Sequence, residues 1–365
     1  MVNHLGNWKN GELGDFVTLK RGFDLPQQKR EDGQVPIFSS SGITGTHSTA
    51  MVKAPGVITG RYGTIGEVFY AAKDFWPLNT TLFVEDFHGN DAKFIYYFLK
   101  TLEWSKFTSA SAVPGINRNT VHKEIASLPD VETQRRIAST LSMFDEKIKI
   151  NTEINDNLQQ QAMSLYAEMF LNSSDSNVTS GTLSDIAVIT MGQSPSGSSY
   201  NEDGVGEVFY QGRAEFGFRF PKRRLFTTEP KRMAEAGDVL LSVRAPVGDL
   251  NIAYERCCIG RGLGAIHSKT DHSSFVLYTM FALRSQLDVF NGEGTVFGSI
   301  NRDALNAIPI DIPPVTEIDQ FEVVAHPIDE LIRANYEENC RLEAIRDSLL
   351  PKLMSGEIDV SAVQL

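Results

Sequence analysis

The sequence predicts an α+β protein in which two mixed α/β modules are separated by two long antiparallel helices, which form a coiled coil with pseudo-two-fold symmetry. Residues 116–170 match residues 300–354 without a gap at 14 of 55 positions, whereas average residue usage gives roughly three or four matches by chance. Such a duplication indicates two copies of one unit. Each matched stretch carries a heptad pattern and follows a region of short β-branched runs and turn residues. We therefore expect a first module at 1–131, a first helix at 132–172, a second module at 173–315 and a second helix at 316–357.

Composition limits the class of protein. The three cysteines among 365 residues match no zinc or disulfide spacing, which favours a reducing, cytoplasmic setting. We expect no signal peptide and no membrane partner, because the chain has neither a leader pattern nor a run of about 18 apolar residues. The net charge of −12 argues against a protein that coats nucleic acid indiscriminately. A sequence reader stays open, because binding depends on the local field at the contact surface.

The first predicted helix has seam residues at alternating spacings of four and three over more than four heptads, with no glycine or proline inside. At 1.5 Å per residue, about 40 residues make a rod of about 60 Å. The seam positions are Ile137, Leu141, Phe144, Ile148, Asn151, Asn155, Leu158, Ala162, Leu165 and Met169.

The second predicted helix repeats this seam less regularly. We expect Pro327 to mark an early turn or a kink, and Pro351 to loosen the last turns. The two helices should pair within one chain, because each is present at a high effective concentration for the other. The seam positions are Phe321, Ala325, Ile328, Ile332, Asn335, Asn339, Leu342, Arg346, Leu349 and Leu353.

Four seam asparagines allow two interpretations. Asn151, Asn155, Asn335 and Asn339 fix the register of the helix pair if antiparallel packing brings their amides together. Alternatively, they are exposed polar positions where the seam lapses.

The two modules share landmarks but diverge between them. Gly11–Asp15 matches Gly181–Asp185, and Arg61 with Ile65-Gly66 predicts a counterpart in Arg244 with Val247-Gly248. Both modules close on Ile-Asn-Arg, where we expect Asn117 and Asn301 to cap the following helix. The polar stretch 172–180 reads as a hinge before the second copy.

Several segments, in this order, carry a family resemblance. They are Trp8…Leu13-Gly14-Asp15, Gly60-Arg-Tyr-Gly-Thr-Ile-Gly66, Leu128-Pro…Gln134-Arg-Arg-Ile-Ala138, Ala236-Gly-Asp-Val-Leu-Leu-Ser-Val-Arg-Ala-Pro-Val-Gly248 and Leu349-Leu-Pro-Lys-Leu-Met-Ser-Gly-Glu-Ile358. On these segments the chain resembles a specificity subunit of a type I restriction-modification system. The segment Gln134–Ala138 is replaced by Asp319-Gln-Phe-Glu-Val323 at the second helix, so we expect the two helices to differ in how they bind partners.

The resemblance implies a non-catalytic subunit. Each module would be a target-recognition domain that reads one half of a bipartite, asymmetric site in double-stranded DNA. The helices would set the spacing of the halves and dock two methyltransferase subunits. Those subunits, and not this chain, would bind S-adenosylmethionine and methylate adenine, with an ATP-driven restriction subunit as an optional further partner. No metal or cofactor is expected in this chain.

Sequence reading requires hydrogen-bonding groups at base edges and cations at phosphates. The second module concentrates basic residues at 213–232, which is either a DNA contact or an ordinary solvated loop. Arg61 and Arg244 either support the fold or contact phosphate. The predicted DNA contacts are Lys20, Arg21, Ser40, Ser41, Arg61, Tyr62, Arg213, Arg219, Lys222, Arg223, Arg224 and Arg244.

Two alternative functions stay open. One is a stand-alone DNA-modifying enzyme, a duplicated methyltransferase or a nuclease; the other is a coiled-coil assembly factor without a DNA role. Phe290–Gly294 fits a methyltransferase pattern, but no Asp/Asn-Pro-Pro-aromatic run accompanies it, and Pro129-Asp130…Glu132 lacks the rest of a nuclease motif. The seven histidines form no ligand pair on one helix face, so we expect no metal site.

Overall fold

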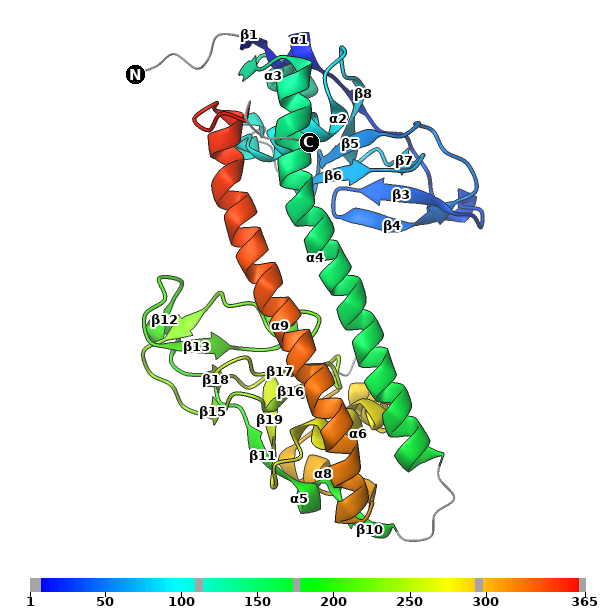
Figure 1. The fold of residues 1–365 in the computed structure, drawn as a ribbon, viewed down its shortest axis with the longest axis vertical. Coiled ribbons are helices and arrows are strands. Elements are labelled where there is room, and N and C mark those ends of the chain that lie inside the picture. Colours follow the sequence, from blue (N-terminus) through cyan, green and yellow to red (C-terminus); the bar gives the residue numbers. More distant parts are fainter. Residues whose placement is uncertain (1–7, 109–113, 173–177, 293–297, 361–365) are drawn as a thin grey trace. The chain divides into compact units, whose positions relative to one another are not determined.

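The structure is a computed structural model that describes residues 8–108, 114–172, 178–292 and 298–360. It contains two compact units, one formed by residues 1–150 and 337–365 and the other by residues 151–336. Each unit holds one α/β module and a part of both long helices (Figure 1). Residues 173–177 of the predicted hinge lie outside the described residues.

The first unit is built on the four-stranded antiparallel sheet β2-β8-β5-β6. A second sheet, β4-β3-β7, and the pair β1-β9 complete its strands. The strands are β1 Lys9–Glu12, β2 Thr18–Arg21, β3 Val35–Ser39, β4 Gly42–His47, β5 Gly56–Gly60, β6 Val68–Ala71, β7 Trp76–Pro77, β8 Thr81–Asp86 and β9 Ile125–Leu128. The helices of the module are α1 Leu13–Phe16, α2 Ala92–Lys100 and α3 Arg118–His122.

The second unit repeats this plan with the sheet β11-β19-β16-β17 and the pair β10-β20, and adds the five-stranded sheet β12-β14-β13-β18-β15. The strands are β10 Thr179–Thr182, β11 Ala187–Met191, β12 Tyr200–Asn201, β13 Glu207–Tyr210, β14 Phe226–Thr227, β15 Met233–Ala234, β16 Val239–Ser242, β17 Leu250–Ile252, β18 Cys257–Ile259, β19 Leu263–Ser268 and β20 Pro309–Ile312. The helices of the module are α5 Leu183–Ile186, α6 Ser273–Ala282, α7 Arg284–Asp288 and α8 Arg302–Asn306.

The duplication is visible in the sheets. Both four-stranded sheets have the same strand order, and each further sheet contains one parallel pair, β3 with β7 and β13 with β18. The sheet that contains the parallel pair has three strands in the first module and five in the second. The two modules therefore differ most in their second sheets, as the divergence of their interiors predicts.

Hydrogen bonds at helix starts confirm the prediction for the repeated asparagines. The Asn117 side chain accepts a hydrogen bond from the backbone N–H of Asn119, and the Asn301 side chain accepts one from Ala304. Asn117 and Asn301 are thus the N-cap residues of α3 and α8. Each side-chain oxygen satisfies a backbone N–H that the first helical turn leaves without an acceptor.

Backbone pairing corrects one alignment between the modules. The N–H of Ile116 donates to the carbonyl of Arg61, whereas the N–H of Ile300 donates to the carbonyl of Val243. Arg61 therefore corresponds to Val243, and Tyr62 corresponds to Arg244. The prediction that Arg61 and Arg244 occupy equivalent positions is wrong by one residue.

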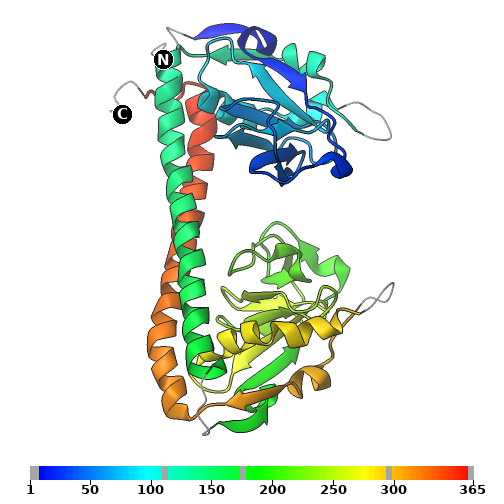
Figure 2. The same ribbon diagram turned by 90° about the vertical axis from the view of Figure 1, so that its right-hand side faces the viewer.

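The two long helices are α4 Val131–Tyr166, which continues into a π-helical turn at Ala167–Leu171, and α9 Val315–Met354. In the first unit Asp145 of α4 pairs with Arg346, while the later Lys147 pairs with the earlier Glu338. The helices are therefore antiparallel there (Figure 2).

In the second unit Asn155 of α4 meets Asn335 of α9, and the later Tyr166 meets the earlier Phe321. The numbering again runs in opposite directions on the two helices. Pro327 lies inside α9, twelve residues after its start, and the helix continues through it. Of the two alternatives predicted for Pro327, the early turn is therefore wrong, and the kink stays a prediction.

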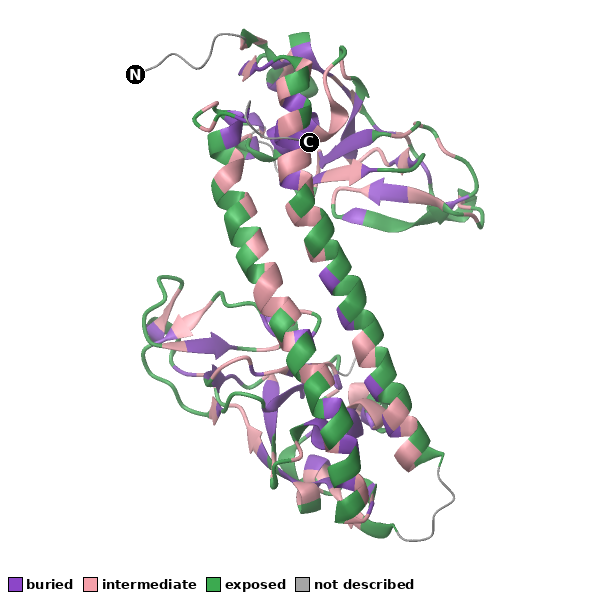
Figure 3. Ribbon diagram, viewed as in Figure 1, coloured by how far each residue is buried: buried purple, intermediate pink, exposed green. Residues whose placement is uncertain are grey.

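The seam positions of both helices are buried or half-buried throughout, which confirms the heptad pattern (Figure 3). Ile137 and Leu141 join the core of the first module, and Ala162 and Phe321 join that of the second. The same seam thus serves helix pairing and module attachment.

The seam asparagines follow the first of the two interpretations where contacts are described. Asn151 and Asn155 are buried, and the Asn335 side-chain amide donates to the Asn155 side-chain oxygen at 2.8 Å. Asn155 in turn donates to the carbonyl of Ile332 at 3.4 Å.

Within the described part of the chain, we find no helix that combines the length and the apolar character needed to cross a membrane.

Candidate nucleic-acid interface

Three of the predicted contacts in the first module meet at one cavity. Arg21, Arg61 and Tyr62 line a cavity of about 480 Å³ together with Ile116 and Arg118. Arg21 ends β2 opposite Leu82 of β8, and Leu82 also pairs with Thr59, two residues before Arg61. Because directly paired residues share one face of a sheet, strand pairing places the two arginines at the same end of that face.

Of the remaining predicted contacts in this module, Ser40 lies near the cavity, while Ser41 and Lys20 bond other side chains of the protein. An added Cβ at Gly60 or Gly63 would stand 3.1 Å from the Ser40 side chain, so Ser40 lies against the loop that carries Arg61 and Tyr62. The Ser41 hydroxyl bonds the Ser39 hydroxyl in the turn between β3 and β4. Lys20 is ion-paired with Glu85.

The basic segment of the second module is largely paired with acids. Arg223 bonds Glu255 through two nitrogens, and Arg224 bonds Glu202 and Glu215. Glu202 and Glu255 lie outside the segment 213–232, so the basic composition of the segment does not reveal them. The exposed pairs Arg223–Glu255 and Arg224–Glu202 are worth about 0–1 kcal/mol each, so these contacts can exchange partners. Glu215 is only 7% exposed, so its pair with Arg224 is partly buried and holds that arginine more firmly.

The other predicted contacts in the second module include Arg213, Lys222 and Arg244, all of which are accessible to solvent. Arg213 is half-exposed and pairs with Asp249, which also accepts from Arg284. Lys222 is exposed and follows directly after the buried Pro221. Arg244 is exposed and its backbone pairs with Ser299.

Arg219 has a different role. Its side chain is only 3% exposed and its guanidinium bonds Asp329 of α9 at 3.1 Å and the Tyr278 hydroxyl at 3.3 Å. Burial raises the pKa of the Asp329 carboxyl, and the charge of Arg219 opposes that shift. Because Arg219 fastens the second module to its helix, we leave it out of the DNA contacts proposed below.

The first unit contains a matching network with a different arginine. Tyr97 of α2 donates to Asp145 of α4 at 2.5 Å, and Arg346 of α9 bonds the same carboxylate at 2.7 Å. Asp145 and Asp329 are the repeated aspartates of the ungapped match. Each of them binds a tyrosine and an arginine at the helix–module junction, a role that the repeat alone does not indicate.

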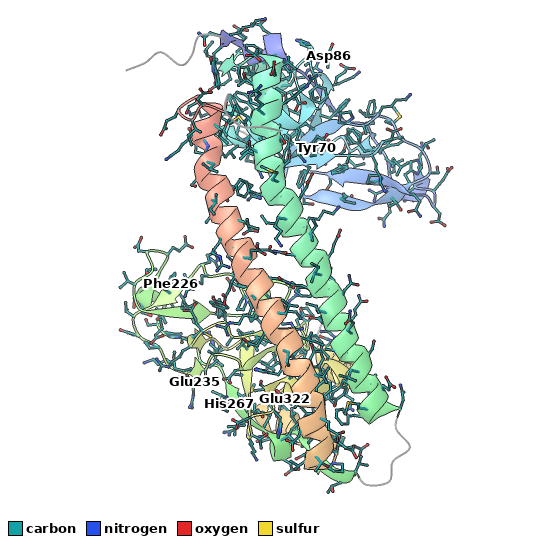
Figure 4. All side chains as sticks on the ribbon, viewed as in Figure 1. Tyr70, Asp86, Phe226, Glu235, His267 and Glu322 are labelled. Carbon is teal, nitrogen blue, oxygen red and sulfur yellow. The ribbon has the colours of Figure 1, made fainter. Side chains whose placement is uncertain are left out.

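The departure between the two helix starts also has a structural account. Gln134 is buried in the first turns of α4, where its side-chain oxygen accepts from the N–H of Asp91 before α2. Glu322 of α9, labelled in Figure 4, accepts from the N–H groups of Ser274 and Phe275 at the start of α6. The long helices thus bind the starts of the equivalent helices α2 and α6 through different residues in different turns. This explains why the segment Gln134–Ala138 has no copy in α9.

The motifs weighed as catalytic have structural roles where they are described. Asp130 accepts from the N–H of Thr133 at 3.0 Å and caps α4. Asn291 accepts from the N–H of Val247 at 2.6 Å, while Glu293 and Gly294 lie outside the described residues. Among the residues that the structure describes, no three His, Cys, Asp or Glu side chains gather as metal ligands.

Comparison with known proteins decides the family. Residues 6–160 and 175–339 match the family model of the type I restriction modification DNA specificity domain. The chain belongs to this family. The two matched ranges each cover one module and the part of the long helix that follows it.

Curated relatives agree with this assignment. The chain is 32% identical over 291 residues to the putative type I restriction enzyme MjaX specificity subunit of Methanocaldococcus jannaschii, a match that covers 73% of this chain and 68% of the relative. It is 23% identical over 346 residues to the type I restriction enzyme HindI specificity subunit of Haemophilus influenzae, covering 71% and 75% of the two chains.

A solved structure supports the fold. The crystal structure of a type I restriction-modification system S subunit from M. genitalium superposes with a TM-score of 0.59 at 19% identity, covering 97% of each chain. The predicted α+β fold is confirmed, and the chain is a type I restriction-modification specificity subunit, a non-catalytic component of such systems.

Proposed function

We propose that each module reads one half of a bipartite, asymmetric DNA target, and that the paired helices set the distance between the halves. The observation that carries this proposal is the uneven divergence of the two copies. Their four-stranded sheets keep one strand order, while their second sheets differ. Two readers of unlike half-sites on a common scaffold require this combination.

The proposed DNA-facing residues are the exposed or half-exposed members of the predicted set. These residues are Lys20, Arg21, Ser40, Ser41, Arg61, Tyr62, Arg213, Lys222, Arg223, Arg224 and Arg244. Guanidinium groups suit this task, because their planar forks match phosphate oxygens and the edge of guanine.

The helices also supply a surface for partner subunits. Met143 and Ile345 are exposed on the helices of the first unit, and Val323, Val324 and Leu331 are exposed on α9 in the second. Exposed apolar side chains on a helix are suited to burial against another protein. We propose that two methyltransferase subunits dock here, that they bind S-adenosylmethionine, and that a restriction subunit is an optional further partner.

The test is reconstitution with methyltransferase subunits. We expect methyl transfer to adenine only in the complex, and none from the chain alone. Met143→Glu and Val323→Glu should each weaken binding of a methyltransferase subunit at least tenfold. Ile43→Glu, an equally exposed apolar position on β4 of the first module, should leave it unchanged. Methyl transfer or DNA cleavage by the isolated chain would contradict the proposal.

A further inference from the structure

The cavity in the first module gathers three cations without a lining acid. We name it the arginine pocket, after Arg21, Arg61 and Arg118. Neither an aspartate nor a glutamate is among the residues that line it. Among the described residues, Asp24 pairs with Arg21 at 3.4 Å, and both side chains are more than half exposed. An ion pair so exposed gives way easily to a stronger anion.

The three arginines are presented by different elements. Arg21 ends β2, Arg61 follows β5, and Arg118 opens α3 directly after the capping residue Asn117. Arg61 is held in place, because its Nε donates to the carbonyl of Ile116 at 3.3 Å and its guanidinium lies 4.6 Å from the centre of the Tyr62 ring. Within the described residues, Arg118 is exposed and forms no ion pair or side-chain hydrogen bond. A held cation, one cation in an exposed ion pair with Asp24, and one cation without a described partner together form a preformed anion site.

The aromatic ring in the pocket is already covered. Arg61 lies over Tyr62, and Gly115 packs so closely that an added Cβ would come within 2.2 Å of the ring. A flipped base or a free nucleobase binds by stacking on an open aromatic face. Arg61 and Gly115 crowd the ring of Tyr62, and the pocket offers three guanidinium groups, which favours phosphate over base.

We infer that the arginine pocket holds a phosphodiester group of the DNA backbone. The volume of about 480 Å³ exceeds that of one phosphate, which leaves room for the sugars on either side of a group within a strand. Planar guanidinium groups bind phosphate oxygens in pairs, so three of them fix both position and orientation. The inference rests on the proposed DNA-reading function and assigns the pocket a positioning role in it.

The second module lacks this set of cations. Strand pairing places Met191 where the first module has Arg21, since Arg21 pairs with Leu82 and Met191 pairs with the corresponding Gly264. Val243 stands in place of Arg61, and only Arg302 matches Arg118. The arginine pocket is therefore a property of the first module, and its loss should affect contacts on one side of the target only.

The experiment compares DNA binding by the full complex with wild-type chain and with the Arg21→Gln/Arg118→Gln variant. Both side chains are exposed, so folding should be retained, which an unchanged melting temperature verifies. The control is Lys73→Gln/Lys123→Gln, which removes two exposed cations outside the pocket in the same module. We expect the variant to bind about tenfold more weakly, with the slope of log affinity against log salt reduced by about 0.9 for the lost phosphate.

A scan with single neutral methylphosphonate linkages locates the contact. The wild type should lose affinity at one or two adjacent linkages in one half of the target, and the variant should be insensitive at those linkages. If the complex binds DNA but the variant matches the wild type at every linkage, the inference is wrong while the DNA-reading function stands. If inorganic phosphate binds the pocket of the wild type and the DNA salt slope does not change in the variant, the pocket is a free-anion site. A complex that binds no DNA overturns the proposed function itself.

Discussion

Arginines of one short segment in the second module differ in what they do. Arg219 is buried against Asp329 of α9, whereas Arg223 and Arg224, a few residues later, are exposed and paired with glutamates. The sequence treats them alike as members of a basic patch. Burial and partner choice separate a residue that fastens the module from two that are available to a ligand.

We predict that Arg223→Ala with Arg224→Ala weakens DNA binding by the complex markedly, with a salt slope reduced by up to about 1.8 for two phosphate contacts. Removing the exposed Arg223–Glu255 pair should change the free energy of unfolding by only about 1 kcal/mol or less. Removing Arg224 leaves the buried Glu215 carboxylate without this partner and should cost more, so the melting temperature of the variant is measured alongside. Arg256→Ala is the matched control, because Arg256 is similarly exposed and pairs with Glu207 and Glu235 in the same module. Equal loss in the control would refute a specific role for the segment.

His122 links the fold of the first module to pH. Its Nε2 accepts the N–H of Leu19 at 2.9 Å, which requires a neutral ring. Burial lowers the pKa of His122, and the charge of Arg118 lowers it further. Between that lowered pKa and the ordinary value of 6.5 the unfolded chain binds more protons than the folded chain, so stability falls as the pH decreases through this window.

Urea unfolding at a series of pH values around 6 checks this prediction. His122→Gln keeps a side-chain acceptor but cannot titrate, so its stability should fall less than that of the wild type on acidification. Parallel pH profiles for the two proteins would show that His122 does not carry the effect.

At the scale of elements, the long helices were the most predictable part. Heptad spacing determines which face is buried, and every seam position is buried or half-buried as expected. Pro327 was misjudged because local propensity places proline in a first turn, whereas packing of its neighbours Ala325 and Ile328 keeps α9 helical around it. Tertiary contacts outweighed the local preference.

The amide pair of the seam gives a prediction at this scale. Asn335→Leu leaves the buried Asn155 oxygen without its donor, which should lower the free energy of unfolding by about 1–3 kcal/mol. Combining it with Asn155→Leu removes both polar groups and should recover much of that loss. A double-mutant cycle in urea measures the coupling. If the costs of the two single substitutions simply add, the pair does not act as a unit.

The candidate site was only partly predictable, for a reason of geometry. Arg21, Arg61 and Tyr62 were chosen as cations and hydrogen-bonding groups in loops, but only strand pairing brings them to one cavity. Arg118 is not among the contacts predicted from the sequence, because the repeated Asn117 next to it indicates a helix cap and gives no sign of a DNA contact. The acids opposite Arg223 and Arg224 come from distant segments, so no local count of charge could reveal them.

At the scale of the whole molecule, duplication followed by divergence explains both the conserved and the variable parts. The repeated aspartates bind a tyrosine and an arginine at each helix–module junction, although the arginine comes from α9 in one unit and from the module in the other. The junctions keep the modules attached to their helices, while the second sheets are free to change. New DNA specificity could then arise in one module without rebuilding the other.

The most direct test of this account is to map the adenines that the reconstituted complex methylates across a whole genome. Two specific half-sites should emerge, separated by a fixed number of unspecified bases, with centres roughly one helical turn or about 10 base pairs apart. Arg21→Gln/Arg118→Gln should reduce methylation without changing the sequence of either half, because phosphate contacts position a protein and base contacts specify the sequence. A single uninterrupted target, or half-sites at variable spacing, would contradict the claim that two modules on one rod read the two halves.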